Sequence, residues 1–400
     1  MDVSSRAAVA PASIPATGRP TTSIAILIAA AVGLGVAHLG TSTMPFQIGA
    51  LMDGAGLSAS RAGLFGFFEV ASLSLTMLLI APVINRFGPA GVAFAGVGLC
   101  ALAHLAMYVA HPSFTVLCLL AGLAGAGYGL VFAASIAAVA AWPSADRIYA
   151  FGNGGALVII VALMSLFPVI SARFGGFGPF LGVAITLAAL SPAMICFRRQ
   201  PIRSTTVNLE VSFRGAGVIA VLVVWTSFSI GNGAVWSFAE RIGHGLSIPP
   251  ETLALVLSAS TLSGIAGTAL AGLLARRVKR AAALVVGLVG TGLASLLLAV
   301  STGLFLYALA VLAYWIFFMF AYSTLLSIAS DLDSTGRVGT AGGGCERMGF
   351  ALGVPLGGLM ADHLSLPAVG VVGFVSCVGL LPFALPPIAS ALARRPKQDC

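Results

Sequence analysis

The stretch RAGLFGFFEVASLSLTMLLIAPVINRFGPA, residues 61–90, decides how the rest of the sequence is interpreted. It is a long apolar run with one acid inside it, Glu69, and it ends in a basic turn that contains Gly88. A related design returns about 190 residues later, where residues 251–275 run into the basic segment RRVKR at 276–280. An apolar helix that ends in a basic turn, used twice, predicts a chain built of two similar halves.

The composition places both halves in a membrane. Apolar residues make up 59% of the chain and charged residues only 8%, whereas ordinary globular proteins have about 25% charged residues. So few charges cannot cover a surface that faces water. The 49 glycines lie inside apolar runs, where membrane helices use small residues for close contact. The sequence therefore predicts an all-α protein that crosses the membrane many times.

Twelve apolar runs of roughly 20 or more residues are each long enough to cross about 30 Å of hydrocarbon. We expect them to be helices, because a backbone in lipid must satisfy its own hydrogen bonds. The runs lie near residues 22–46, 60–83, 90–110, 114–140, 148–172, 177–196, 216–239, 251–274, 281–300, 303–329, 338–360 and 367–391.

The basic residues predict the orientation. With both termini in the cytoplasm, 16 of the 20 Lys and Arg residues fall on cytoplasmic segments, and only Arg61, Arg173 and Arg241 fall on outer loops. This bias is the positive-inside pattern of an inner or plasma membrane protein. It also argues against nucleic-acid binding, in spite of the net charge of +8, because the cations are topology signals. We expect the partners to be a small organic substrate and membrane lipids, and the protein to be a monomer.

The longest polar internal segment, residues 198–214, divides the runs into two sets of six. We therefore expect a disordered cytoplasmic tail at 1–20, a six-helix bundle at 21–197, a cytoplasmic linker at 198–214, a second bundle at 215–393 and a tail at 394–400. At the same offset of about 190, Arg147 aligns with Arg337, and Gly152 and Gly154 align with Gly342 and Gly344. Parallel six-helix repeats are typical of transporters with a site at the repeat interface.

The basic turns resemble those of the major facilitator superfamily, whose loop after the second helix reads Gly-x-x-x-Asp-Arg-x-Gly-Arg-Arg. Residues 81–90 match it at Arg86 and Gly88, and the second half matches it at Gly272 and Arg277, with Arg276 in place of the acid. The resemblance implies twelve transmembrane helices in two pseudo-symmetric six-helix bundles. It also implies alternating access, with Arg86, Gly88 and Arg277 in gating loops.

Ionisable residues inside a membrane helix each cost about 2.5–3.5 kcal/mol on insertion scales, so they are candidates for function. Glu69 lies near mid-membrane, on one helix face with Ser72 and Thr76. It is either a protonatable carboxylate that couples proton movement to transport, or a structural acid bound to a neighbouring helix.

Glu346 and Arg347 lie at a similar depth in the eleventh run. Adjacent residues on a helix point in different directions, so we expect them to have separate partners. In the resembled family the second and eleventh helices meet where the halves touch. Arg347 is therefore expected to pair with Glu69 in one conformation or to bind an anionic substrate, unless it pairs within the second half.

Further candidates for binding or coupling lie on helices that line the central cavity of the family. His38 is a substrate ligand, a proton carrier or a buried histidine with one hydrogen bond, and the aromatic residues of the tenth run form either packing or a binding box. Glu240 beside Arg241 suggests a solvated gate pair. The remaining candidates are Tyr128, Asn153, Asn232, Trp236, Tyr314 and Trp315. For Tyr128 the competing interpretation is close helix contact, and Asn153 is a candidate if its helix face points inward.

No GxSxG, HExxH or GxxxxGK[ST] motif occurs, so we expect neither an enzyme nor an ATP-driven pump. The six cysteines are scattered singly, which predicts no metal site or disulfide framework. We expect no cofactor, and a proton as the coupling ion. The leading hypothesis is a secondary transporter of a small organic anion. The alternatives are an efflux pump for hydrophobic or cationic compounds, in which Glu69 and Glu346 attract the cation, and a non-transporting receptor or scaffold.

Overall fold

The computed structural model describes residues 24–80, 83–140, 142, 144–199, 215–275, 277–333 and 336–393, and in this part every regular element is a helix. The first half contains α1 (Ile24–Ala55), α2 (Ala59–Ile80), α3 (Ile84–Phe87), α4 (Pro89–Ala110), α5 (Phe114–Ala140), α6 (Ala145–Phe174), α7 (Gly178–Leu190) and the 3₁₀ helix η1 (Ser191–Arg199). The second half contains α8 (Ala216–Gly245), α9 (Pro250–Leu274), α10 (Arg280–Ala299), α11 (Leu304–Leu332), α12 (Arg337–His363), α13 (Ala368–Val378) and α14 (Leu381–Ala393).

These elements correspond to the twelve expected spans. The sixth is α7 continued by η1, the twelfth is α13 with α14, and α3 is a single turn before α4. Eleven segments in the described part are long and apolar enough to cross a membrane. The remaining span is α12, which carries charged residues that include Glu346 and Arg347.

One boundary differs clearly from the sequence-based expectation. The first run was expected to end near residue 46, but α1 continues to Ala55. The reason is that its polar residues have partners. Gln47 is fully buried and bonded to Thr43, and Asp53 binds Arg241 in the other half. Loss of hydropathy therefore did not mark the end of the helix.

The two halves repeat the same packing. The first helix of each half packs on the fifth (α1 on α6, α8 on α12), and the second packs on the fourth (α2 on α5, α9 on α11). Arg147 and Arg337, aligned by the repeat, both lie in the first turns of fifth helices, and both side chains are exposed. The internal repeat is confirmed as two six-helix bundles.

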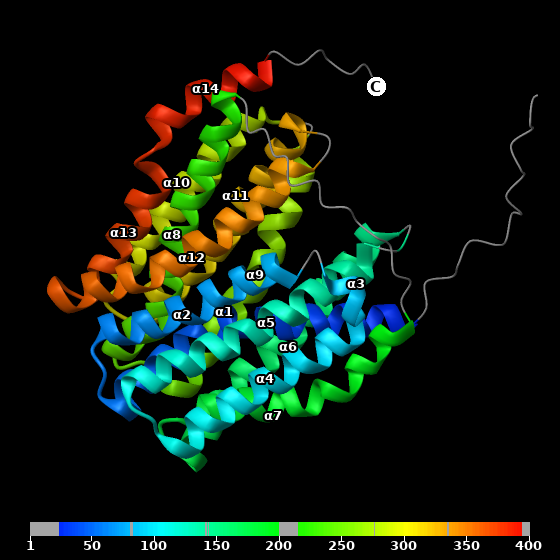
Figure 1. Ribbon diagram of the computed structural model, residues 1–400. Coiled ribbons are helices and arrows are strands. Elements are labelled where there is room, and N and C mark those ends of the chain that lie inside the picture. The colour runs from blue at the N-terminus through cyan, green and yellow to red at the C-terminus, as the bar shows by residue number, and fades with distance from the viewer. Residues whose placement is uncertain are drawn as a thin grey trace, which may run out of the picture.

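The bundles meet at one end and diverge towards the other (Figure 1). Contacts between them run from α2 to α12, α6 to α9 and α1 to α8. Gly63 and Gly358 make the first of these possible, because a Cβ at Gly63 would meet the backbone of Val354 and Pro355 and one at Gly358 would meet Ala59. We call this end, which carries the α1–α2 and α8–α9 connections, the closed end.

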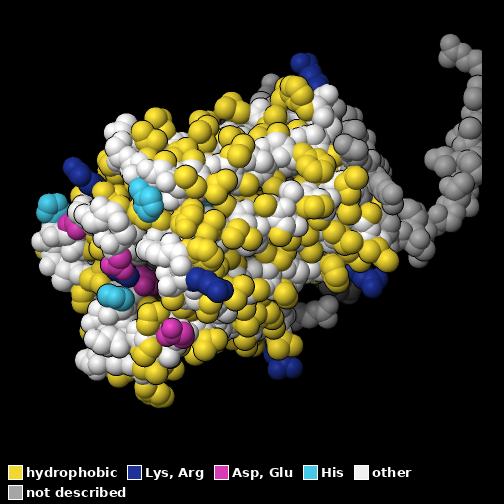
Figure 2. Space-filling view, turned by 90° about the horizontal axis from the view of Figure 1, so that it is seen from below, with side chains coloured by type: hydrophobic (Ala, Val, Ile, Leu, Met, Phe, Trp, Pro, Cys, Tyr) yellow, Lys and Arg dark blue, Asp and Glu magenta, His cyan; other side chains and the backbone are white. Residues whose placement is uncertain are grey.

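The outer surface is largely apolar. Large hydrophobic side chains such as Leu79, Leu102, Val158, Phe305 and Phe383 are exposed on helices of both halves. In Figure 2 hydrophobic side chains cover most of the visible face, while acidic and histidine side chains gather towards its left end. A surface of this kind fits lipid rather than water. The expected tails at 1–20 and 394–400, and the linker from residue 200 on, lie outside the described residues.

Candidate functional site

A proline in α1 prepares the first contact between the halves near mid-membrane. Pro45 has no N–H, so the carbonyl of Thr41, four residues earlier, has no donor within its own helix. The indole Nε1 of Trp236 on α8 donates to this carbonyl at 3.1 Å. Trp236, a predicted site residue, thus ties α8 to the backbone of α1.

Arg347 lies beside this contact. Its Nε is 3.2 Å from Oε2 of Glu346, its Nη1 is 3.4 Å from Oγ1 of Thr41, and its Cζ lies 5.3 Å from the ring centroid of Phe132 on α5. The expectation of separate partners for Glu346 and Arg347 is wrong, because the long side chains bend together although their Cα atoms point apart. Arg347 does not pair with Glu69 in this conformation, and the pair lies within the second half.

His38 belongs to the same group of residues. Its Nδ1 lies 2.8 Å from the carbonyl oxygen of Leu34, and its ring meets the Phe132 ring edge-on at 5.3 Å. Phe132 therefore contacts both His38 and Arg347. The single hydrogen bond agrees with the simpler interpretation of His38, but its position places it in the candidate site.

The aromatic residues of α11 complete this group on the side of the second half. Tyr314 donates its hydroxyl hydrogen to Oδ1 of Asn232 at 2.8 Å, and Trp315 meets Trp236 edge-on at 4.9 Å. The Nε1 of Trp315 is buried without a hydrogen-bond partner among the described residues. Most of this aromatic surface is packed, and one indole N–H remains for another acceptor.

Glu69 lies apart from these residues, inside the first half. Its side chain is 1% exposed, and neither carboxyl oxygen has a hydrogen-bond partner among the described residues. A Cβ at Gly40 of α1 would overlap Oε1, so glycine makes the space for the carboxyl group. Ser72, expected on the same face, donates to the Gly122 carbonyl of α5 at 2.7 Å. The polar stripe of α2 is therefore directed at α5 and α1.

Tyr128 also lies inside the first half. Its hydroxyl is 3.4 Å from Nε2 of His104 on α4, whose Nδ1 is 2.9 Å from the carbonyl oxygen of Cys100. The sequence analysis missed His104, a lone histidine in an apolar run. Asn153 is exposed on α6 and is not brought to Arg347 or Glu69.

The closed end is held by two polar contacts between the halves. Arg241 binds Asp53 of α1 at 2.7 Å and Glu240 at 2.6 Å, and the carboxylate of Asp362 accepts hydrogen bonds from the N–H groups of Ala59 and Ser60 at 3.0 and 2.8 Å. The expected gate pair of Glu240 and Arg241 exists. It is not solvated, however, since the Arg241 side chain is 8% exposed and the Glu240 side chain 12%.

The basic turns lie at the opposite end of the halves. Gly88 adopts a φ of 73°, which favours glycine, and separates α3 from α4, while Arg86 and Arg277 are exposed. Arg280, which the sequence analysis did not select, is the residue that makes contacts here, with Ser327 and Asp331 of α11.

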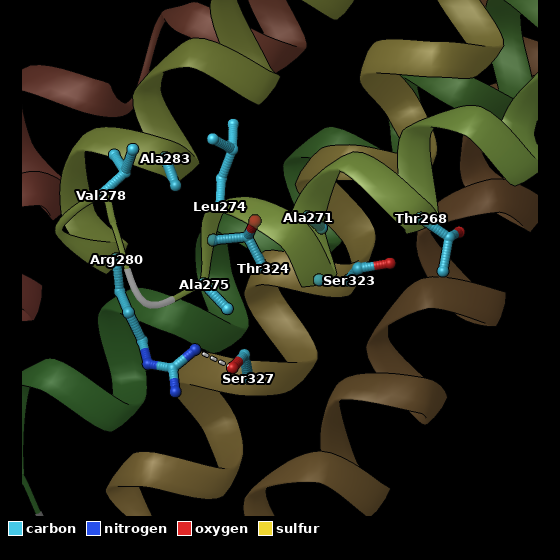
Figure 3. Close-up of a pocket in the computed structure, with 11 residues that line it drawn as sticks. Thr268, Ala271, Leu274, Ala275, Val278, Arg280, Ala283, Ser323, Thr324 and Ser327 are labelled. Atoms are coloured by element: carbon cyan, nitrogen blue, oxygen red, sulfur yellow. Dashed lines mark hydrogen bonds between the residues drawn. The ribbon is translucent and has the colours of Figure 1, made fainter.

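Arg280 also lines a cavity of about 270 Å³ between α9, α10 and α11, and its side chain points at Ser327 (Figure 3). None of the candidate site residues near Arg347 or Glu69 lines this cavity. It belongs to the turn and not to the candidate site. In the described part of the chain no group of three or more His, Cys, Asp or Glu side chains could hold a metal ion.

Two repeated six-helix bundles, an apolar outer surface and buried charged side chains where the bundles meet define an integral membrane transporter. The family model of the Major Facilitator Superfamily matches residues 25–344, so the chain belongs to this superfamily. Among solved structures, a bacterial homolog of the human lysosomal transporter Spinster, in an inward-facing and unoccupied conformation, matches with a TM-score of 0.64. That match has 13% sequence identity and covers 92% of this chain and 95% of that one. No curated protein matches the sequence.

Proposed function

We propose that this protein moves a small organic anion across the membrane by alternating access, and that proton movement through Glu69 drives it. The observation that carries the proposal is the position of Arg347. It is a buried cation that lies where the two halves meet, and it contacts Thr41 and Phe132 of the first half from α12 of the second. Buried charges in membrane helices mark substrate or ion pathways.

The contacts of Arg347 leave capacity for a ligand. A guanidinium has five N–H donors, and the described partners use only Nε and Nη1. Glu346 neutralises the cation in this conformation, so a substrate carboxylate would compete with it for the same donors. The neighbouring aromatic side chains, Trp236, Tyr314 and Trp315, favour an anion with an aromatic or apolar body.

The proposed transport cycle follows from the arrangement of the halves. Contacts between them are concentrated at the end that holds Asp53, Ser60 and Asp362. The charge bias of the sequence makes this the outer end, with both termini in the cytoplasm of an inner or plasma membrane. In this conformation the substrate would exchange between the site and the cytoplasm. Opening towards the outside requires the contacts of Arg241 and Asp362 to break.

A second candidate function is the export of hydrophobic or cationic compounds. The observation that favours it is Glu69, a buried acid whose carboxyl oxygens have no hydrogen-bond partner in the described part of the chain. In this case Glu69 and Glu346 would attract the cation, and Arg347 would matter little for binding.

Reconstitution in liposomes separates the two. The internal pH and the uptake of substrate are followed during exposure to a panel of small organic acids and lipophilic cations. Anion transport predicts proton-linked uptake of an acid, at least a tenfold loss in Arg347→Ala and partial activity in Arg347→Lys. Arg173→Ala, which removes an exposed arginine from the last turn of α6, is the control. Uptake of cations only, unchanged in Arg347→Ala, would contradict the anion proposal.

A further inference from the structure

The indole of Trp315 carries a hydrogen-bond donor that the described part of the chain does not use. Its Nε1 is buried and has no acceptor among the described residues, and the residue is 9% exposed. Buried indole N–H groups usually have a partner, because a donor that is removed from water without an acceptor is unfavourable. The N–H of Trp315 therefore points to an acceptor on a bound molecule.

The other unpartnered donors described in the second half lie on α8 in closed surroundings. They are Nε1 of Trp225 and the hydroxyl groups of Ser229 and Ser237, and all three residues are 0% exposed. A Cβ at Gly342 of α12 would overlap the Trp225 ring, and one at Gly349 would meet Cβ of Ser229. Helix α12 thus packs directly over these two residues and leaves no room for a ligand. Trp315 differs from them because part of its surface remains accessible.

Trp315 belongs to the same group of residues as Arg347. Its ring meets the Trp236 ring edge-on, with 4.9 Å between the centroids, and Trp236 donates to the Thr41 carbonyl at 3.1 Å. The hydroxyl of the same Thr41 lies 3.4 Å from Nη1 of Arg347. The guanidinium and the unused indole N–H are therefore linked through one pair of residues, and a single small molecule could contact both.

The surroundings of the indole favour a neutral acceptor over a second charge. The ring contacts of Trp315 are all with aromatic residues, namely Trp236, Tyr314 and Phe318. The hydroxyl of Tyr314 already donates to Asn232. A second carboxylate beside these uncharged rings would be buried without a cation, which is strongly unfavourable, whereas a carbonyl or ether oxygen needs only one donor.

We propose that the transported anion carries a neutral hydrogen-bond acceptor, such as a keto or ether oxygen, on its apolar body. Trp315 donates its Nε1–H to this acceptor while Arg347 binds the carboxylate. The substrate class narrows from organic anions in general to carboxylates with such an oxygen, and Trp315 is the residue that distinguishes them from analogues without it. This inference deepens the proposed function and rests on it, since it requires the anion to bind at Arg347.

Matched pairs of ligands test the assignment. Each pair consists of an aryl alkanoate and the ketone in which a carbonyl replaces the CH₂ beside the ring, as in phenylbutyrate and benzoylpropionate. A series of chain lengths covers different spacings between the carboxylate and the carbonyl. Isothermal titration calorimetry on the purified full-length protein gives the affinities. At one chain length or more, the wild type is expected to bind the ketone about three- to tenfold more tightly, which is the effect of one neutral hydrogen bond.

Trp315→Phe keeps an aromatic ring and removes the N–H, so the ratio of the two affinities is expected to fall to about one. Both ligands are compared on the same variant, and a partial loss of folded protein therefore affects them alike. Trp225→Phe, which removes an indole N–H that α12 covers, is the matched control and keeps the preference for the ketone. In ultraviolet resonance Raman spectra, the ketone is expected to shift the indole N–H band of one of the four tryptophans. This shift is absent with the CH₂ compound and in Trp315→Phe.

Two results would overturn the assignment. One is equal affinity for the two members of every pair in the wild type, and the other is a preference for the ketone that survives Trp315→Phe. Arg347→Ala separates this inference from the proposed function, because it is expected to weaken the binding of both members of a pair. If it weakens neither, or if no acid binds to the wild type, the anion site is wrong and the inference falls with it. If it weakens both while Trp315→Phe leaves their ratio unchanged, only the inference fails.

Discussion

Trp236 shows how one hydrogen bond can matter at the junction of the halves. Replacing it by Phe leaves the carbonyl of Thr41 buried without a donor, since Pro45 cannot supply one. We expect Trp236→Phe to lower the stability of this conformation by about 1–3 kcal/mol, measured as a lower Tm in detergent. Trp225→Phe is the matched control, because the Nε1 of Trp225 is buried and has no hydrogen-bond partner among the residues that the structure describes. Equal losses in the two variants would mean that ring size, and not the hydrogen bond, is responsible.

Glu346 is the second residue whose replacement is expected to have a defined effect, in this case on the KM for the substrate. It holds Nε of Arg347 at 3.2 Å, so it competes with an anionic substrate for the guanidinium. Glu346→Gln is expected to lower the KM for the organic acid several-fold, because a neutral amide competes less well than a carboxylate. Transport assays in liposomes give this value. An increase in KM would indicate that Glu346 positions Arg347 instead of competing with the substrate.

At the scale of helices, the contact between α2 and α12 depends on the absence of a side chain at Gly63. A Cβ there would meet the backbone of Val354 and Pro355, which cannot move aside as a flexible side chain can. Gly63→Val is therefore expected to separate α2 from α12 and to open the closed end. Spin labels on the α1–α2 and α8–α9 connections would report a longer distance. Gly98→Val, at a position with open space around it, is expected to leave the distance unchanged.

The helices were predictable because they depend on local sequence. The number of apolar runs, the repeat that aligns Arg147 with Arg337, and the all-helical fold class follow from composition and periodicity, and the structure confirms them. Boundaries set by tertiary partners were not predictable. The end of α1 at Ala55 depends on Arg241, which lies far away in the sequence.

The site was predictable only in part for the same reason. His38, Asn232, Trp236, Tyr314, Trp315 and Arg347 were selected as polar or aromatic groups inside apolar runs, and the structure brings them together. Their partners were not evident, because Thr41 acts through a backbone carbonyl that Pro45 leaves free, and Asp362 binds the backbone of a helix in the other half. A proline four residues after a polar position was the available signal for Thr41.

At the scale of the whole molecule, closure depends on carboxylates at one end. Asp362, in the last turn of α12 beyond its apolar part, accepts the N–H groups of Ala59 and Ser60 in the other half. Partial burial alone would raise its pKa, but hydrogen bonds from Ser60 and Ala59 outweigh this effect and hold the pKa below its ordinary value. The charged form therefore favours the closed end.

The sign of the pH dependence follows. Because the pKa of Asp362 is lower when it is bonded to α2, its contribution to closure is present above the ordinary value of 3.8 and is lost as the pH falls below it. Distances between spin labels at the closed end are expected to lengthen on acidification in the wild type. In Asp362→Asn this part of the pH dependence is absent. An identical acid response in the two proteins would exclude Asp362 as its source.

The carbonyl that Pro45 leaves free has a consequence for hydration. When α8 moves away to open the closed end, Thr41 loses the indole of Trp236 and no N–H in its own helix can replace it. A water molecule, or a hydroxyl or amide hydrogen of the transported molecule, then becomes the donor. We therefore expect α1 to carry an ordered water at this level in the opposite conformation. A transported molecule that replaces this water donates the hydrogen bond to the Thr41 carbonyl in its place, and it thereby stabilises the conformation to which it binds.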